Sequence, residues 1–190
     1  MNWFIALPIS PAGWFDERVT SPPKGTTLFH RDDLHMTIAF LGSCGSERAH
    51  AAWAAMRWPL GPVSAQLEKV VPLGPPKRFS ALSATCTEPR PGGRNEPPKR
   101  IEAAMDVARH DAARAAAVTV DPRPPLAHVT LARPRRNATP DERKAALAWA
   151  SALELGAPTI DLARLALYTW AEDRGRPGSR AFRIVEERAV

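Results

Sequence analysis

Residues 35–39 read His-Met-Thr-Ile-Ala and residues 128–132 read His-Val-Thr-Leu-Ala, two copies of one pattern, His-x-Thr-apolar-Ala. The copies begin 93 residues apart, about half of the 190-residue chain. Because the chain has only five histidines, two matches in the same apolar setting are rare by chance. The repeat therefore predicts a fold with two similar halves.

Both copies have the composition of β-strands, in which alternate side chains point to opposite faces. His35 and Thr37 should share one face while the residues between and after them enter the core, and His128 and Thr130 should do the same. If the two strands meet about a pseudo-twofold axis, two imidazoles and two hydroxyls converge. Such a group offers a base, an acid and donors for an anion, as in-line attack on a phosphodiester requires. The alternatives are structural histidines in half-buried strands, or a zinc site, for which no third ligand stands at suitable spacing.

The rest of the chain predicts segregated helices and strands, which favours an α+β fold over a parallel doubly wound sheet. Helices are expected after a cap at Ser46, over 100–116, and from the capping box of Thr139 and Glu142 to about residue 153. Loops are expected over 20–27 and over the proline-rich stretch 88–99, to which we assign no role. Strands are expected over 3–7, 34–41, 63–71, 79–85, 127–132, 162–169 and 181–186.

Composition limits the class of protein and its partners. The chain has 26 Lys and Arg against 20 Asp and Glu, a net charge of +6, and 21 of the 26 cations are arginine. This balance indicates an anionic partner or, equally, a coding bias toward arginine. No apolar run reaches the roughly 18 residues of a membrane span, so no membrane partner is expected. Two cysteines, Cys44 and Cys86, are too few for a disulfide framework, and a reducing, cytoplasmic location is expected.

Four stretches together resemble the two-histidine phosphoesterase superfamily. Within it, the sequence resembles the LigT-like RNA 2′,3′-cyclic phosphodiesterases of bacteria and archaea, once called 2′-5′ RNA ligases. The stretches are WFIALPI (3–9), LHMTIAFLG (34–42), AHVTLARPR (127–135) and LALYTWAEDRGRPGSRAFRIV (165–185). The sequence departs from the family pattern at Trp170, where a small hydroxyl residue is usual, and at Phe182, where tyrosine is usual.

The resemblance implies one bilobal domain over residues 1–190, with two intertwined lobes of antiparallel strands, outer helices and a central cleft. It implies that His35 is the general acid that protonates the 3′ oxygen and that His128 is the general base that activates water. Thr37 and Thr130 would hold phosphate oxygens, and Arg133, five residues after His128, would contact the phosphate. No metal and no cofactor are expected.

The activity implied is hydrolysis of RNA 2′,3′-cyclic phosphate ends to 2′-phosphates by a monomeric enzyme. Alternative activities are hydrolysis of small cyclic nucleotides, ADP-ribose cyclic phosphate or 2′-5′ oligonucleotides, and 2′-5′ RNA ligation. A non-catalytic nucleotide-binding or RNA-binding module is the alternative from another class. Phe4 and Tyr168 are candidate substrate contacts, although Phe4 also suits a core strand. The basic turn with Arg174, Arg176 and Arg180 is either an RNA-backbone contact or a solvated loop.

Overall fold

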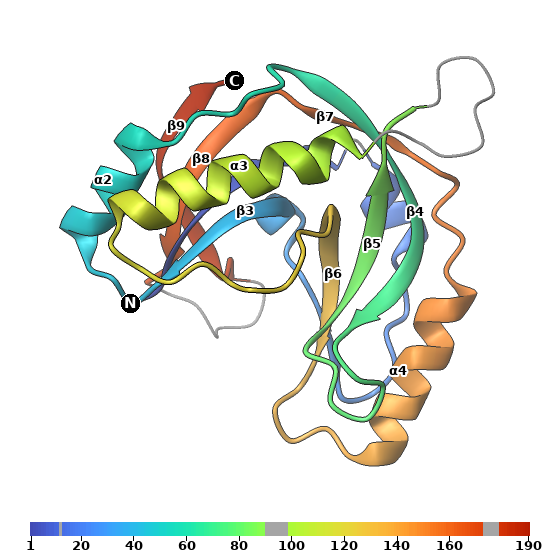
Figure 1. The fold of residues 1–190 in the computed structure, drawn as a ribbon. Coiled ribbons are helices and arrows are strands. Elements are labelled where there is room, and N and C mark those ends of the chain that lie inside the picture. Colours follow the sequence, from blue (N-terminus) through green and yellow to red (C-terminus); the bar gives the residue numbers. More distant parts are fainter. Residues whose placement is uncertain (12, 90–98, 173–178) are drawn as a thin grey trace.

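Two antiparallel sheets organise the protein (Figure 1). The computed structural model describes residues 1–11, 13–89, 99–172 and 179–190. The first sheet has the order β3 (His35–Gly42), β1 (Trp3–Pro8), β8 (Arg164–Trp170) and β9 (Phe182–Ala189). The second has the order β2 (Thr26–Leu28), β6 (His128–Pro134), β5 (Ala81–Thr87), β4 (Val63–Leu73) and β7 (Thr159–Leu162). Both sheets draw strands from both halves of the chain.

Helices cover the outside of each sheet, as expected of an α+β fold. Helices α2 (Ser46–Ala55) and α3 (Arg100–Ala115) pack on each other and against β1 and β3 of the first sheet. Helix α4 (Pro140–Ala152) packs against β2, β4 and β6 of the second sheet (Figure 1). The predicted capping box is confirmed: Thr139 accepts from the Glu142 N–H, and the Glu142 carboxylate accepts from the Thr139 N–H.

Three local predictions were wrong. The strand expected over 162–169 is divided at Ala163 into β7 and β8, because the chain crosses there from the second sheet to the first. The loop expected over 20–27 ends in strand β2, which pairs with β6. The residue that caps α2 is Gly45, with φ of 91°, and Ser46 is the first helical residue. The short helices α1 (Trp14–Arg18) and η1 (Arg31–Asp33) were not foreseen.

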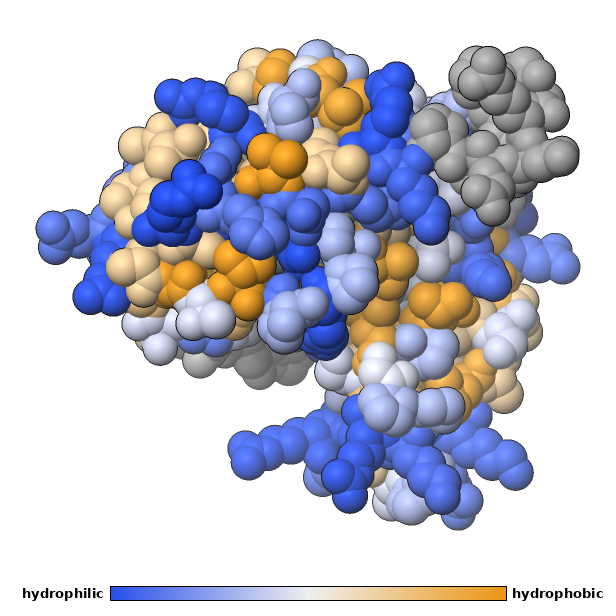
Figure 2. All heavy atoms as spheres, viewed as in Figure 1, coloured by the Kyte–Doolittle hydropathy of each residue, from blue (hydrophilic) through white to orange (hydrophobic). Residues whose placement is uncertain are grey.

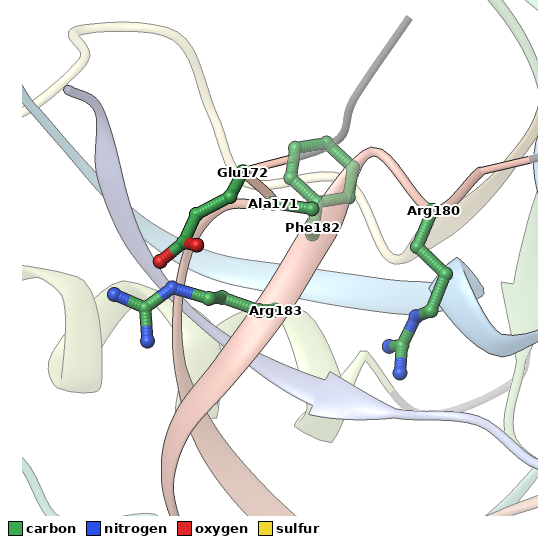
Figure 3. A pocket seen from close by; sticks show the side chains of 5 residues that line it. All are labelled: Ala171, Glu172, Arg180, Phe182 and Arg183. Atoms are coloured by element: carbon green, nitrogen blue, oxygen red, sulfur yellow. The ribbon is translucent and has the colours of Figure 1, made fainter. Parts of the chain in front are cut away.

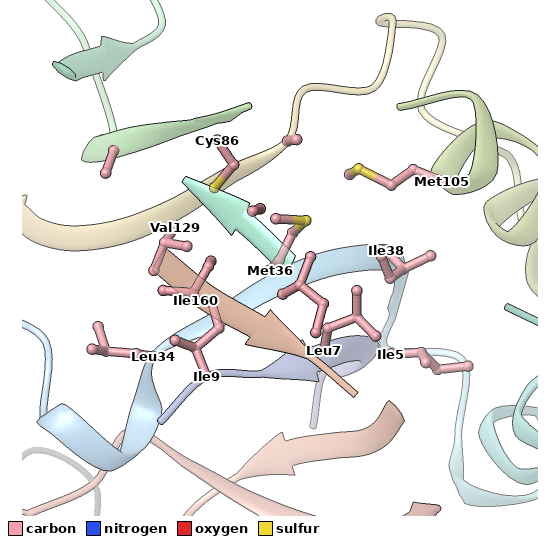
Figure 4. Close-up of a cluster of buried hydrophobic side chains, with 14 of the residues drawn as sticks. Ile5, Leu7, Ile9, Leu34, Met36, Ile38, Cys86, Met105, Val129 and Ile160 are labelled. Atoms are coloured by element: carbon pink, nitrogen blue, oxygen red, sulfur yellow. The ribbon is translucent and has the colours of Figure 1, made fainter. Parts of the chain in front are cut away.

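One continuous apolar core fills the space between the sheets and helices. Side chains from β1 and β3, such as Ile5, Leu7 and Met36, meet Met105 of α3 and Val129 of β6 there (Figure 4). A second, smaller cluster lies on the opposite face of the first sheet and consists of Phe4, Ala6, Ala166, Tyr168 and Phe182. Strand β1 is buried throughout because it contributes to both clusters.

The two motif strands share a burial pattern and an irregularity. In β3 and in β6 the histidine and threonine are half-buried, the residues between and after them are buried, and the sixth residue is exposed. Each strand also contains a β-bulge: Ile38 is the extra residue opposite β1, and Leu131 is the extra residue opposite β5. The predicted alternation is therefore confirmed up to the bulge, where it changes phase.

Candidate active site

A pocket of about 370 Å³ lies where the first sheet meets the second. Strand β3 carries one motif and β6 the other, and these two strands pack against each other although they belong to different sheets (Figure 1). Most of the pocket wall is aromatic or polar. Its residues are Asn2, Phe4, His35, Thr37, Phe40, Ser80, Arg133, Trp170 and Phe182.

The two motif histidines are anchored in the same way. The Nδ1–H of His35 donates to the carbonyl of Asp33 at 2.6 Å, and the Nδ1–H of His128 donates to the carbonyl of Leu126 at 2.7 Å. In each case the acceptor lies two residues before the histidine. A carbonyl only accepts, so the proton of the neutral ring is fixed on Nδ1 and Nε2 carries the lone pair. The repeat thus extends from sequence to side-chain geometry.

An aromatic cage surrounds the imidazole of His35. Ring centroids of Phe4, Tyr168 and Phe182 lie 4.9, 5.3 and 5.3 Å from it. The cage removes water from the ring, and this desolvation lowers the pKa of His35 from 6.5 to about 4. The hydrogen bond to Asp33 opposes the shift, while the positive charges of Arg133 and His128 add to it.

His128 is the first residue of β6 and is not among the residues that line the pocket of His35. Burial lowers its pKa from 6.5, and the hydrogen bond to the Leu126 carbonyl opposes this. Thr130 follows His128 by two residues on β6. Its hydroxyl lies 3.1 Å from the hydroxyl of Ser83, a fully buried residue of β5. Ser83 was not predicted as a site residue, because a single serine within a strand carries no sequence signal.

The two bulges place Phe40 and Arg133 at equivalent positions of the pocket. Each lies five residues after its motif histidine, and each follows the bulged residue, so it turns to the same face as the motif threonine. The Arg133 guanidinium carbon lies 4.8 Å from the centre of the Phe29 ring, a cation–π arrangement that holds it at the rim. Phe40 is 62% exposed, which is unusual for so large an apolar side chain. Sequence reasoning missed Phe40, although its place in the repeat matches that of Arg133.

Asp33 connects the first motif to the hairpin β8–β9. Its carboxylate is 1% exposed and accepts from Arg180 Nε at 3.1 Å and from the Ala181 N–H at 2.5 Å. Its carbonyl is the acceptor that holds His35. Arg180, which was expected either in a solvated loop or on an RNA backbone, therefore makes structural contacts here. Arg174 and Arg176 lie outside the described residues.

Of the remaining predicted site residues, Phe4 lines the pocket and Tyr168 lies in the protein interior. Phe4 also packs in the smaller apolar cluster as a core residue. Tyr168 is fully buried behind Phe4, with the two rings stacked at 4.9 Å, and burial raises the pKa of its hydroxyl. No hydrogen-bond partner for that hydroxyl occurs among the described residues. Tyr168 thus supports the pocket from behind.

A second hollow of about 400 Å³ lies between the end of β8 and the start of β9 (Figure 3). Arg180, Arg183 and Glu172 point around it, and Phe182 is common to both hollows. It contains neither motif histidine, whereas His35 lines the first pocket.

Two further observations concern metals and membranes. Within residues 1–11, 13–89, 99–172 and 179–190, no three His, Cys, Asp or Glu side chains are grouped closely enough to hold a metal ion. Among the helices of that part of the chain, none has the length and apolar character that crossing a membrane requires.

Solved structures share this fold over the whole chain. TT0787 of Thermus thermophilus superposes with a TM-score of 0.67 at 16% identity, covering 100% of this chain and 97% of that one. LigT of Escherichia coli, crystallised with 3′-AMP, gives 0.66 at 21% identity and covers 100% and 97%. A protein described as a phosphoesterase gives 0.64 at 20% identity and covers 100% and 98%. No model of a known protein family matches the sequence, and no curated protein matches it.

These likenesses confirm the α+β fold that the segregated helices and strands predicted, with the antiparallel sheets that the resemblance implied. The chain has the fold of LigT of Escherichia coli and of the protein described as a phosphoesterase.

Proposed function

We propose that the protein hydrolyses 2′,3′-cyclic phosphate ends of RNA to 2′-phosphates, with His35 and His128 as acid and base. The observation that carries the proposal is the pair of imidazoles on adjoining strands, each with Nδ1–H fixed by the carbonyl two residues earlier. Opening a cyclic phosphate needs one proton removed from water and one delivered to the leaving oxygen. Two imidazoles with free Nε2 atoms supply both transfers.

The phosphate would sit between the motif strands. The Thr37 hydroxyl and the Arg133 guanidinium line the same pocket as His35 and would hold the non-bridging oxygens, and Thr130 would add a hydroxyl from the second motif. These donors are fixed before the reaction, so they stabilise the charge that develops on phosphorus without reorganising. His128 would take the proton from the attacking water while His35 protonates the 3′ oxygen, which leaves the phosphate on the 2′ oxygen.

The pocket itself favours a nucleotide end over a bare phosphate. Phe40 and Trp170 add aromatic surface to the polar site, and such surface stacks with any base. LigT of Escherichia coli was crystallised with 3′-AMP, with ATP and with NADP⁺, which supports a nucleotide as the ligand here. A small cyclic nucleotide is therefore the second candidate substrate, and a pocket of about 370 Å³ is the observation that favours it.

Turnover of 2′,3′-cyclic AMP and of a cyclic-phosphate-ended oligonucleotide tests the proposal. Because acid–base catalysis contributes about 10²–10⁴-fold, His35→Ala and His128→Ala should each lower kcat at least about 100-fold, with an unchanged circular dichroism spectrum. His110→Ala, on the outer helix α3, is the matched control and should keep full activity. The product should be the 2′-phosphate, which chromatography separates from the 3′ isomer.

Two results would contradict the proposal. Tight nucleotide binding without turnover would indicate a non-catalytic binding module. Turnover that survives loss of either motif histidine would show that the chemistry lies elsewhere.

A further inference from the structure

The net positive charge of the protein is concentrated at one end of the second sheet. Segments 21–25, 74–80 and 133–144 contain eight of the 26 cations and only two of the 20 acids. The rest of the chain has 18 cations and 18 acids, so these three segments account for the whole net charge of +6. A general coding bias toward arginine does not explain such a separation.

Tertiary contacts bring the three segments together. The Arg135 N–H donates to the Gly25 carbonyl at 2.7 Å, which joins the segment after β6 to the segment before β2. Arg143 of α4 donates to the Phe79 carbonyl at 2.9 Å, which joins α4 to the turn between β4 and β5. Figure 2 shows hydrophilic side chains projecting from this end, below the two sheets. Apart from Arg133, which lines the pocket, the exposed cations here are Lys24, Lys77, Arg78, Arg135, Arg136 and Lys144, and we call these six the basic end.

The basic end begins at the rim of the candidate active site. Ser80, the last residue of segment 74–80, and Arg133, the first of segment 133–144, both line the pocket of His35. One of the two acids, Glu142, is engaged in the capping box of α4. A polyanion whose end lies in the pocket can therefore continue over this rim onto a surface of cations.

We propose that the basic end binds the sugar-phosphate backbone of the RNA strand whose cyclic-phosphate terminus occupies the pocket. This inference rests on the proposed function and extends it from the cyclic-phosphate end in the pocket to the part of the RNA strand that lies outside the pocket. Three of the six cations are arginines, whose planar fork bonds phosphate through two N–H groups. Because the basic end adjoins the pocket, one RNA strand can occupy both. Binding to a membrane surface would not require a pocket beside the cations, so RNA is the favoured partner.

The test compares substrates of different length in charge-neutralising variants. One variant combines Lys77→Ala, Arg78→Ala, Arg135→Ala and Arg136→Ala, and its control combines Arg48→Ala with Arg114→Ala on the exposed faces of α2 and α3. None of these side chains lines the pocket. The wild type and both variants are assayed for hydrolysis of 2′,3′-cyclic AMP and of a twelve-nucleotide RNA with a cyclic-phosphate end. Binding of the labelled oligonucleotide is measured by fluorescence anisotropy.

Salt dependence gives the expected size of the effect. Single-stranded nucleic acid contributes about −0.7 to the slope of log affinity against log salt for each phosphate neutralised. With about four contacts the slope is near −3, so raising salt from 50 to 200 mM should weaken oligonucleotide binding by the wild type about 50-fold. The fourfold variant should lose most of this slope and bind weakly even at 50 mM. Its hydrolysis of 2′,3′-cyclic AMP should equal that of the wild type and of the control.

Each failure has a distinct meaning. Equal oligonucleotide binding by the fourfold variant and the wild type would overturn the inference while leaving nucleotide hydrolysis intact. Loss of binding to phosphatidylserine vesicles with RNA binding unchanged would overturn it in favour of a membrane contact. Because anisotropy requires no turnover, failure of the proposed hydrolysis would not hide either result.

Discussion

The protonation state of His35 in the free protein conflicts with its proposed role, and binding of phosphate should resolve the conflict. With a pKa of about 4, about one molecule in a thousand carries the imidazolium at pH 7. A general acid must be protonated when the substrate is bound. A single negative charge about 4 Å away at an effective dielectric of about 20 stabilises the imidazolium by about 4 kcal/mol. At about 1.4 kcal/mol for each pKa unit, that energy raises the pKa by about 3 units.

We therefore expect the pKa of His35 to rise to between about 6 and 7 when a nucleotide 2′-phosphate fills the pocket, since the anion offsets the desolvation by the aromatic cage. Proton–nitrogen NMR of the imidazole, recorded from pH 3.5 to 8 with and without adenosine 2′-monophosphate, measures this directly. In the free protein the neutral ring should carry its proton on Nδ1, as the bond to Asp33 requires. The resonances of His110, on α3, should not respond to the nucleotide.

Removing a neighbouring charge supplies a second measurement. The guanidinium of Arg133 lowers the pKa of His35, so Arg133→Gln should raise that pKa in the free protein and weaken the response to the nucleotide. In the bound state an acid and a base would coexist near neutral pH, so kcat should pass through a maximum there. If the pKa of His35 stays below about 5 with the phosphate bound, His35 cannot be the acid. The roles of His35 and His128 would then be exchanged.

Two other predictions concern the binding of phosphate. Arg133→Lys should lower kcat/KM for 2′,3′-cyclic AMP far more than Arg135→Lys or Arg136→Lys, because a lysine cannot reproduce a paired guanidinium–phosphate contact. Equal effects of the three substitutions would show that Arg133 does not contact the phosphate. Hydrolysis should also persist in excess EDTA, because imidazolium, hydroxyls and guanidinium are expected to stabilise the developing charge; activity that is lost with chelator and restored by divalent ions would show a metal-dependent mechanism.

Much of the candidate site follows from local patterns. The repeat places His35 with Thr37 and His128 with Thr130 because side chains alternate along a strand whatever the rest of the chain does. The capping box of α4 is equally local, since it involves residues three positions apart. The predicted alternation of faces fails beyond the bulges at Ile38 and Leu131. A bulge forms only when a strand pairs with its neighbour, so the sequence of one strand does not reveal it.

The sequence by itself therefore determined the two motifs, their strands and the α+β class, all of which depend on short-range periodicity. Only the tertiary structure decided what surrounds the motifs. Tyr168 and Phe182 reach His35 across the first sheet and set its pKa by excluding water. The cations of the basic end come from three segments far apart in the chain. Desolvation and charge act through space, so their strength depends on which distant residues the fold brings together.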